Sequence, residues 1–283
     1  MIKKGIILAG GTGTRMSPLT KAVNKQLLPI YDKPLIFYPL SILMLSGIRN
    51  ILIVVNKGQL EQYKKILPNG DNLGIKISYT EQPSPKGLPD AFLIGEKFIN
   101  NDNVALILGD NFFYGQNLTN KLRKQAQLSK GASVFLHPVN KYELYGVAKI
   151  DKKNKIIGIK EKPKKFYSNY AVTGLYYFDK KVIEYSKKLK PSKRKELEIV
   201  DLLNIYKKKN IDSRLLLKAI RISDIVLLIL DANIETLDRL HRGLTDYSLN
   251  NGKGLIIIFN KWDLIKDKKK TKKKLINFVK FSL

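Results

Sequence analysis

Short apolar runs alternate with longer, mixed segments along the first part of the chain. The apolar runs lie at residues 6–8, 51–55, 75–79 and 104–108. Between them are amphipathic segments of helical length, as at residues 35–46 and 88–98. Apolar runs of this length are typical of strands that are buried in a sheet. Strands that alternate with helices predict an α/β fold with a parallel sheet.

The loops that follow the four predicted strands are the first candidates for a functional site. In a parallel α/β sheet, ligands bind beside the carboxyl ends of the strands. We therefore expect one active site to be formed by the loops that begin at Ala9, Asn56, Thr80 and Gly109.

The first of these loops is rich in glycine, and residues 10–15 read Gly-Gly-Thr-Gly-Thr-Arg. Glycines allow backbone N–H groups to approach a triphosphate closely, and Arg15 adds a bidentate cation. The loop lacks the Gly-Lys-Ser/Thr ending of a P-loop, and a plain strand-to-helix turn is the alternative interpretation. The nucleotide-binding prediction comprises Gly10, Gly11, Thr12, Gly13 and Thr14.

Composition narrows the possible chemistry. With 283 residues, 44% of them hydrophobic, the chain is long enough to bury a sizeable core. It lacks a run of about 18 apolar residues and a cleavable signal, so we expect a soluble cytoplasmic protein without membrane binding. Cysteine is absent, which excludes disulfides, thiolate metal sites and cysteine nucleophiles. Catalysis must then depend on Asp, Glu, Lys, Arg and backbone groups.

The net charge is strongly positive, because 52 Lys and Arg face 24 Asp and Glu, giving +28. Such a charge is found in proteins that bind nucleic acid. Here the excess is lysine scattered along helices and loops, without the interleaved aromatic residues of an RNA-binding surface. We interpret it as a solvated surface that attracts phosphorylated substrates rather than nucleic acid.

Further motifs follow the glycine-rich loop in a fixed order. They are KQLLP at 25–29, DKP at 32–34, QPSPKG at 82–87, LGDN at 108–111, YGV at 145–147, EKP at 161–163 and NYAVTGLY at 169–176. Over residues 1–210 this series resembles the glucose-1-phosphate thymidylyltransferases, a family of sugar-phosphate nucleotidyltransferases. The resemblance implies a Rossmann-like nucleotidyltransferase core with a mostly parallel sheet, and usually a homotetramer. It also implies Mg²⁺-dependent thymidylyl transfer from dTTP to glucose 1-phosphate, giving dTDP-glucose and pyrophosphate.

Transfer of a nucleotidyl group requires charge neutralisation and in-line positioning rather than a covalent nucleophile. Arg15 and Lys25 match the cations that neutralise the triphosphate in the family. Asp110 directly follows the apolar run at residues 104–108, so its carboxylate should emerge at a strand end and bind Mg²⁺. A turn-forming aspartate is the alternative, and Asn111 is assigned to the nucleotide.

The resemblance also assigns residues to the base and to the sugar phosphate. The base-recognition segment comprises Gln82, Pro85 and Gly87, and Gln26 is assigned to the nucleotide as well. On the acceptor side, Glu161 would bind sugar hydroxyls and Lys162 the sugar phosphate. The remaining predicted contacts to the hexose are Tyr145, Gly146, Val172 and Gly174. Residues 196–201 continue the resemblance, and we interpret them as structural.

Beyond residue 210 the pattern changes. The family continues with a strand ending in Trp-Leu-Asp-Thr-Gly, whose aspartate is the second metal ligand, and this chain has no such segment. Residues 218–265 instead resemble an incomplete G domain of the ribosome-assembly GTPases with tandem G domains, in which Asn260 and Asp263 would bind guanine. We therefore predict a catalytic domain at 1–210 and an atypical α/β tail at 211–283. Asp231 is a candidate replacement for the missing carboxylate.

The sequence leaves three functions open. The first is thymidylyl transfer, with uridylyl transfer as its close variant. The second is a guanine-nucleotide-binding protein associated with ribosomes, which the tail motif and the positive charge favour. The third is a catalytically impaired fusion that binds nucleotide without turning it over.

Overall fold

The computed structural model describes residues 1–11, 13, 20, 23–115, 117–151, 155–192, 194–208, 214–216, 225–231, 254–260, 267, 268, 270 and 271. The chain divides into two compact units. The first comprises Met1–Phe113 and Asn117–Ala219, and the second Tyr114–Gln116 and Ile220–Leu283. The boundary at 210/211 that we expect from the sequence stays a prediction.

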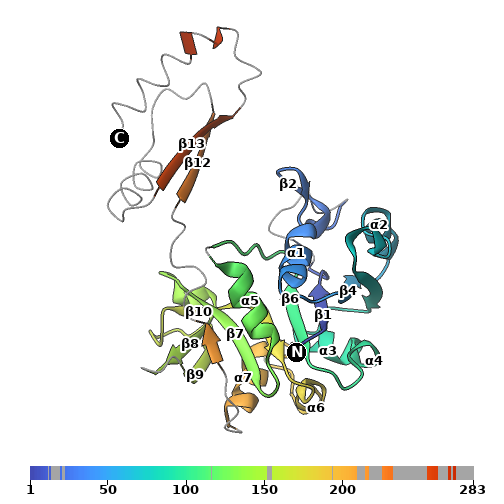
Figure 1. The fold of residues 1–283 in the computed structure, drawn as a ribbon. Helices are drawn as coiled ribbons and strands as arrows, with labels where there is room; N and C mark the ends of the chain where they lie inside the picture. Colours follow the sequence, from blue (N-terminus) through green and yellow to red (C-terminus); the bar gives the residue numbers. More distant parts are fainter. Residues whose placement is uncertain are drawn as a thin grey trace. The chain divides into compact units, whose positions relative to one another are not determined.

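The first unit is built around a sheet in which nine strands belong to the described residues, in the order β11-β7-β10-β6-β1-β4-β5, with β8 paired to β10 and β9 to β8 (Figure 1). Their bounds are β1 (Lys4–Leu8), β4 (Asn50–Asn56), β5 (Lys76–Gln82), β6 (Val104–Leu108), β7 (Ala132–Pro138), β8 (Gly146–Ile150), β9 (Ile156–Glu161), β10 (Tyr170–Phe178) and β11 (Arg214–Leu216).

The half of the sheet formed by β6, β1, β4 and β5 is parallel. On the other side, β10 runs antiparallel to β6, β7 and β8, and β8 and β9 form an antiparallel pair. The predicted Rossmann-like core is therefore confirmed. The chain passes from β1 to β4 and β5 and then returns to place β6 on the opposite side of β1, which creates a topological switch point between β1 and β6.

The helices agree with the amphipathic segments, with one difference. They are α1 (Phe37–Leu45), α2 (Leu60–Ile66), α3 (Asp90–Ile94), α4 (Glu96–Ile99), α5 (Leu118–Ala126), α6 (Val182–Lys187) and α7 (Ile199–Lys208). The segment expected as one helix at 88–98 is divided at Gly95, where a side chain would come within 2.9 Å of the Ala91 carbonyl oxygen and 3.1 Å of Ile6. The break lets the chain pass closely against β1.

One strand is longer than its apolar run. The sequence places the end of the third strand at Tyr79, whereas β5 continues to Gln82 because its polar end still pairs with β4, Gln82 opposite Asn56. The loop toward the expected site thus begins after Gln82 and not at Thr80. Short elements complete the unit, namely the 3-10 helices η3 (Lys25–Leu27), η4 (Asp71–Leu73) and η5 (Tyr142–Leu144) and the hairpin strands β2 (Pro29–Ile30) and β3 (Lys33–Pro34).

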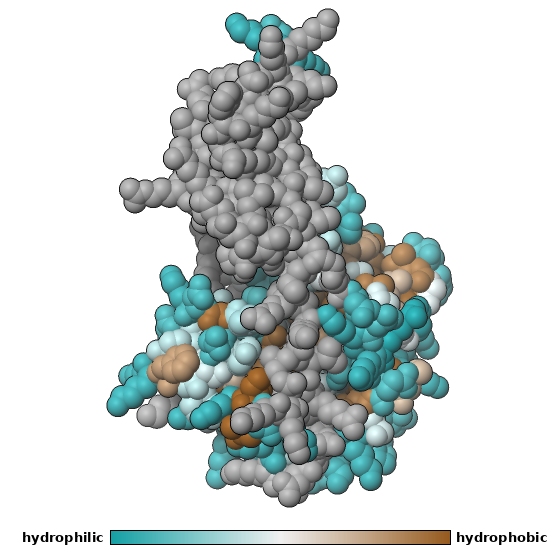
Figure 2. Space-filling model, turned by 60° about the vertical axis from the view of Figure 1, so that its left-hand side comes forward, coloured by the Kyte–Doolittle hydropathy of each residue, from teal (hydrophilic) through white to brown (hydrophobic). Residues whose placement is uncertain are grey.

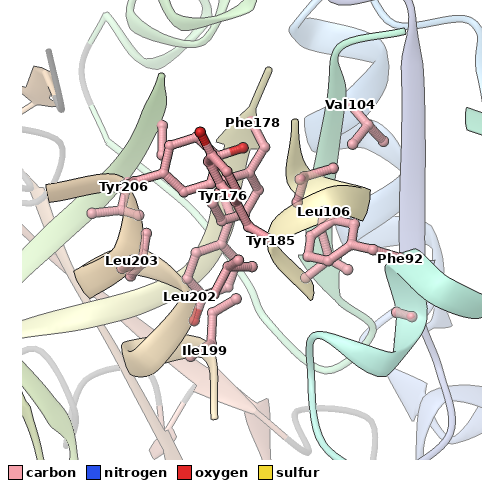
Figure 3. Close-up of a cluster of buried hydrophobic side chains, with 14 of the residues drawn as sticks. Phe92, Val104, Leu106, Tyr176, Phe178, Tyr185, Ile199, Leu202, Leu203 and Tyr206 are labelled. Atoms are coloured by element: carbon pink, nitrogen blue, oxygen red, sulfur yellow. The ribbon is translucent and has the colours of Figure 1, made fainter. Parts of the chain in front are cut away.

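An apolar cluster lies between α3, α6 and α7 and one face of the sheet. Figure 3 shows Leu202, Leu203 and Tyr206 of α7 directed toward the rings of Tyr176 and Phe178 on β10. Because alternate residues of a strand point to opposite faces, the neighbour Tyr177 belongs to the other face, where its hydroxyl lies 3.0 Å from Ser46 Oγ beyond the end of α1. Both faces of the sheet are thereby covered.

Replacing Phe178 with alanine is expected to lower the free energy of unfolding by about 3–5 kcal/mol. Phe178 is fully buried, and its ring centroid lies 5.3 Å from those of both Phe92 and Tyr206. Denaturant unfolding would measure the loss. The matched control is Phe166→Ala, since Phe166 is 70% exposed, and it should change stability by less than about 1 kcal/mol. Similar losses in both variants would contradict the assignment of this core.

The second unit contains a parallel pair of strands, β12 (Ile225–Asp231) and β13 (Gly254–Asn260). Their register places Asp231 opposite Asn260, so both strands end in a polar residue at the same edge. Asp263, the second residue of the predicted guanine motif, lies outside the described residues.

The surface in view in Figure 2 is mostly hydrophilic where it is coloured, with smaller hydrophobic patches between. This agrees with the interpretation of the lysines as solvated. None of the helices in the described part of the chain has the length and apolar character that a membrane span requires.

Candidate active site

A cavity of about 430 Å³ lies at the carboxyl ends of the strands on both sides of the switch point. Backbone hydrogen bonds hold the ends of these strands and the loops that follow them together. The Ala9 amide donates to the Val54 carbonyl at 2.8 Å, and the Gly109 amide donates to the Leu8 carbonyl at 2.9 Å. The loops after β1 and β6 therefore leave the sheet side by side, as the sequence predicts.

Gly10 and Gln82 contact each other at the side of the cavity where the sequence predicts nucleotide binding. The Gln82 amide nitrogen donates to Asn56 Oδ1 at 2.8 Å and to the Gly10 carbonyl at 3.2 Å. A side chain at position 10 would come within 1.8 Å of that same nitrogen. Glycine is thus required so that Gln82, which is 5% exposed, can lie against the loop.

Gly87 joins the predicted base loop to the segment that precedes α7. Gly87 forms a parallel bridge with Leu197, and the Leu197 amide donates to the Lys86 carbonyl at 2.7 Å. The φ angle of Gly87 is +101°, and a Cβ there would come within 2.1 Å of the Leu197 carbonyl oxygen. Both the angle and the close approach demand glycine.

Asp110 follows β6 and lines the cavity, and its carboxylate forms an ion pair with Lys25 at 2.7 Å. Lys25 is held by η3, where the Asn24 side chain caps the Gln26 amide at 3.0 Å. The described residues contain no group of three or more metal-binding side chains. One carboxylate at the edge of a cavity nevertheless fits Mg²⁺, which usually keeps several waters and takes one or two carboxylates together with substrate oxygens.

Gln26 presents an unsatisfied acceptor beside this ion pair. The residue is 2% exposed and lines the cavity, and its Oε1 atom is buried without a hydrogen-bond partner among the described residues. A buried acceptor without a donor costs about 1–3 kcal/mol. Because Gln26 lines the cavity, a ligand bound there can supply the missing donor.

The side of the cavity predicted to bind the sugar phosphate is formed by β9 and the loop before β8. Glu161 ends β9, and a side chain at Gly146 would come within 2.9 Å of its carboxylate. Lys162 adopts a left-handed conformation, with φ +39°, and its amide donates to the Tyr145 carbonyl at 3.0 Å. A lysine in this conformation is strained, and such strain concentrates at functional sites.

The electrostatics of Glu161 are set by a mixture of charges. Burial raises the pKa of its carboxyl, the negative charges of Glu198 and Asp201 raise it further, and the positive charges of Lys162 and Arg194 act in the opposite direction. The pKa of Glu198 behaves differently. Burial acts to raise it, but hydrogen bonds from Ser192 and Arg194 outweigh burial, and its pKa is lowered.

Most of the predicted site residues meet at this cavity. Those that line it are Gly10, Gly11, Gln26, Gln82, Pro85, Gly87, Asp110, Tyr145, Gly146, Glu161, Lys162 and Val172. Lys25, Gly13, Asn111 and Gly174 are not among the lining residues. Of these, Lys25 contacts Asp110, and a side chain at Gly174 would come within 1.9 Å of Asn111 Nδ2. Thr12, Thr14 and Arg15 lie outside the described residues.

The interpretation of residues 196–201 as purely structural is incomplete. Arg194 and residues 196–200 line the cavity. The segment is brought there by the bridge between Leu197 and Gly87, which joins residues far apart in the sequence. The alternation of acidic and apolar residues just before α7 was the available signal, but it reads equally well as an ordinary helix start.

Comparison with known protein families agrees with this geometry. The family model described as nucleotidyl transferase matches residues 4–221. The chain belongs to the nucleotidyl transferase family.

Individual relatives of known kind are similar to this chain over most of its length. A glucose-1-phosphate thymidylyltransferase of Neisseria meningitidis is 53% identical over 203 residues, which cover 72% of this chain and 70% of the relative. One from Mycolicibacterium smegmatis is 48% identical over the same shares. Among solved structures, a protein described as a glucose-1-phosphate thymidylyltransferase from Bacillus anthracis, in complex with a sucrose, has a TM-score of 0.69 and 40% identity, covering 75% of this chain and 85% of that chain. A UDP-glucose pyrophosphorylase in complex with UDP-glucose has a TM-score of 0.66 and 31% identity, covering 76% and 90%.

Proposed function

We propose that this chain transfers a thymidylyl group from dTTP to glucose 1-phosphate, releasing pyrophosphate and forming dTDP-glucose. The observation that carries the proposal is the single cavity in which the nucleotide-side residues Gly10, Gln82 and Asp110 and the acceptor-side residues Glu161 and Lys162 meet. The similarity to thymidylyltransferases over about 72% of the chain supports it.

In this reaction an oxygen of the sugar phosphate forms a bond to the α-phosphorus of dTTP, and the bond from that phosphorus to the bridging oxygen of the leaving pyrophosphate breaks. Lys162 would bind and orient the attacking phosphate, while Glu161 would accept hydrogen bonds from the sugar hydroxyls. On the other side, Lys25 would exchange its contact with Asp110 for the triphosphate and, with Arg15, stabilise charge that moves onto the leaving group.

Nucleotidyltransferases of this family generally use a divalent metal. We propose that this metal is Mg²⁺ and that Asp110 would hold it together with waters and phosphate oxygens, where it would supply positive charge between the phosphates. The residues of this chain would then bind the two substrates, orient them and exclude water from them.

Base recognition is proposed at Gln82, Pro85 and Gly87. The side-chain nitrogen of Gln82 already donates to Asn56 and to the Gly10 carbonyl, which fixes the orientation of the amide. A backbone and an amide held in place in this way suit the edge of thymine. They suit uracil equally, so preference between dTTP and UTP is an outcome to be measured.

The test is pyrophosphate release with Mg²⁺, glucose 1-phosphate and one nucleotide at a time: dTTP, UTP or GTP. Release that requires both the sugar phosphate and dTTP, with weaker or no release from the others, is expected. Release with UTP but not with dTTP would show that the chain transfers a uridylyl group instead. Absence of release with every nucleotide from folded protein would overturn the proposal in favour of the impaired fusion.

Substitution of Gln26 by methionine offers a test of the nucleotide side. Because the free protein then loses a buried acceptor that has no donor among the described residues, the variant should be at least as stable as the wild type in denaturant unfolding. The KM for dTTP should rise about 5- to 20-fold, since the bound state loses a hydrogen bond. An unchanged KM, or a loss of stability, would contradict this role of Gln26.

Two expectations from the resemblance remain proposals. We expect a homo-oligomer, with a tetramer as the usual form of the family, and this can be measured by light scattering. We also expect the protein in the cytoplasm, where its nucleotide and sugar phosphate substrates are available.

A further inference from the structure

Arg194 lines the cavity close to Glu161, and its half-exposed side chain is held by two carboxylates. Its Nη2 atom lies 2.7 Å from Glu198 Oε2, and its Nε donates to Glu198 Oε1 at 3.2 Å. The same Nη2 atom lies 3.5 Å from Glu161. A bidentate pair of this kind fixes both the position and the plane of the guanidinium group.

Glu198 is itself restrained from two directions. Its carboxylate, 12% exposed, accepts a hydrogen bond from Ser192 Oγ at 2.6 Å, and Ser192 Oγ also accepts from the Arg194 amide at 3.2 Å. The preceding residue, Leu197, is tied to the base loop through Lys86 and Gly87. The guanidinium group is therefore anchored to a segment that is connected to the nucleotide side of the cavity.

We propose that Glu198 is a positioning residue that holds Arg194 beside Glu161, so that a fixed cation faces the anionic acceptor substrate at this end of the cavity. The inference rests on the proposed function, because it takes the acceptor to be a sugar phosphate. Glu198 itself need not touch the substrate.

The arrangement has a second consequence for Glu161. The groups that face its carboxyl are Glu198, Lys162, Arg194 and Asp201, and the hydroxyl of Tyr176 lies in the same region. Removing the charge of Glu198 removes the largest charge effect on the pKa of Glu161, which raises that pKa. Releasing Arg194 removes a smaller effect of opposite sign, so the pKa of Glu161 should fall. If ionised Glu161 binds the sugar hydroxyls, binding is lost as the pH falls through this pKa. In the Glu198→Gln variant the loss should then occur at a lower pH.

A double-mutant cycle tests the proposal, with Glu198→Gln, Arg194→Ala and the double variant. The readouts are the KM values for both substrates from pyrophosphate release and the Kd of glucose 1-phosphate from calorimetry. Glu198→Gln should raise the KM and Kd for glucose 1-phosphate about 10-fold while changing the KM for dTTP by less than about 2-fold. When Arg194 is already alanine, Glu198→Gln should raise the KM and Kd for glucose 1-phosphate by less than about a further 2-fold.

Glu198 also directly precedes α7, and its backbone carbonyl accepts a hydrogen bond from the Leu202 amide at 3.3 Å. The experiment must therefore distinguish the positioning of Arg194 from a role of Glu198 in the stability of α7. Such a role would lower the melting temperature, raise both KM values and persist without Arg194, and any of these results would overturn the proposal. The Kd for glucose 1-phosphate should be measured as a function of pH. If the pH at which binding is lost is the same in Glu198→Gln as in the wild type, the coupling of Glu198 to Glu161 is overturned. Glu96→Gln is the matched control, because Glu96 forms an exposed ion pair with Lys187 at 2.6 Å and does not line the cavity.

The wild-type measurements separate this inference from the proposed function. If the wild type binds glucose 1-phosphate without releasing pyrophosphate, transfer is refuted and the comparison of Kd values still decides the role of Glu198. If the wild type binds no glucose 1-phosphate, both proposals are overturned.

Discussion

Asp110→Asn should reduce the rate of pyrophosphate release about 10³-fold, which corresponds to about 4 kcal/mol of transition-state stabilisation. Asp110 lies at the carboxyl end of β6 and lines the cavity beside Lys25. The amide keeps the size of the side chain but loses the charge that would hold Mg²⁺ against the phosphates. Steady-state release at saturating dTTP and glucose 1-phosphate measures the effect, and the Mg²⁺ concentration for half-maximal rate should also rise.

Asp102→Asn is the matched control at the other end of the same strand. Asp102 forms an ion pair with Lys4 at 2.8 Å, outside the cavity, and its side chain is 60% exposed. The variant should keep the wild-type rate, and both variants should remain folded. If Asp110→Asn kept more than about a tenth of the activity, Asp110 would not be the metal ligand and the turn-forming interpretation would stand.

Lys162→Met should lower kcat/KM for glucose 1-phosphate about 10²- to 10³-fold, because it removes the cation proposed to bind the attacking phosphate. Lys162 has a left-handed backbone conformation directly after β9, and its amide donates a hydrogen bond to the Tyr145 carbonyl. The KM for dTTP should change little. Initial rates over a matrix of the two substrate concentrations would separate these effects.

The control for this variant is Lys160→Met, two residues earlier in the chain. The Lys160 ammonium lies 4.6 Å from the ring centroid of Tyr167 and does not line the cavity. Loss of this exposed contact should leave the kinetics unchanged. Equal losses in the two variants would show that charge in general, and not the position of Lys162, attracts the sugar phosphate.

The second unit bears on how much activity to expect. The aspartate of the family's Trp-Leu-Asp-Thr-Gly segment has no counterpart in this sequence. Asp231 ends β12, where it pairs in register with Asn260 of β13. Its role as a replacement metal ligand stays a prediction, which the variant Asp231→Asn would test through the rate and Mg²⁺ dependence of pyrophosphate release. An unchanged rate and Mg²⁺ dependence would remove Asp231 from the site.

Much of the fold could be predicted from the chain because it depends on local patterns. The apolar runs correspond to β1, β4 and β6 because a strand buried on both faces needs apolar side chains at successive positions. The less apolar run at 75–79 belongs to β5, which lies at the edge of the sheet and is only partly buried. The ends of elements were less predictable. The extension of β5 to Gln82 depends on hydrogen bonds to β4 that form whatever the side chains are.

The sequence by itself determined the α/β class, the absence of cysteine chemistry and the set of motifs, since each depends on residue type and spacing along the chain. Only the tertiary structure decided which residues meet. It paired Lys25 with Asp110, buried the Gln26 carbonyl oxygen with no donor in the described part of the chain, and brought Leu197 to Gly87 and Arg194 to Glu161. Most of these contacts join positions far apart in the chain, and they form because the order of the strands brings separate loops to one cavity. Such constraints arise only once the chain is folded.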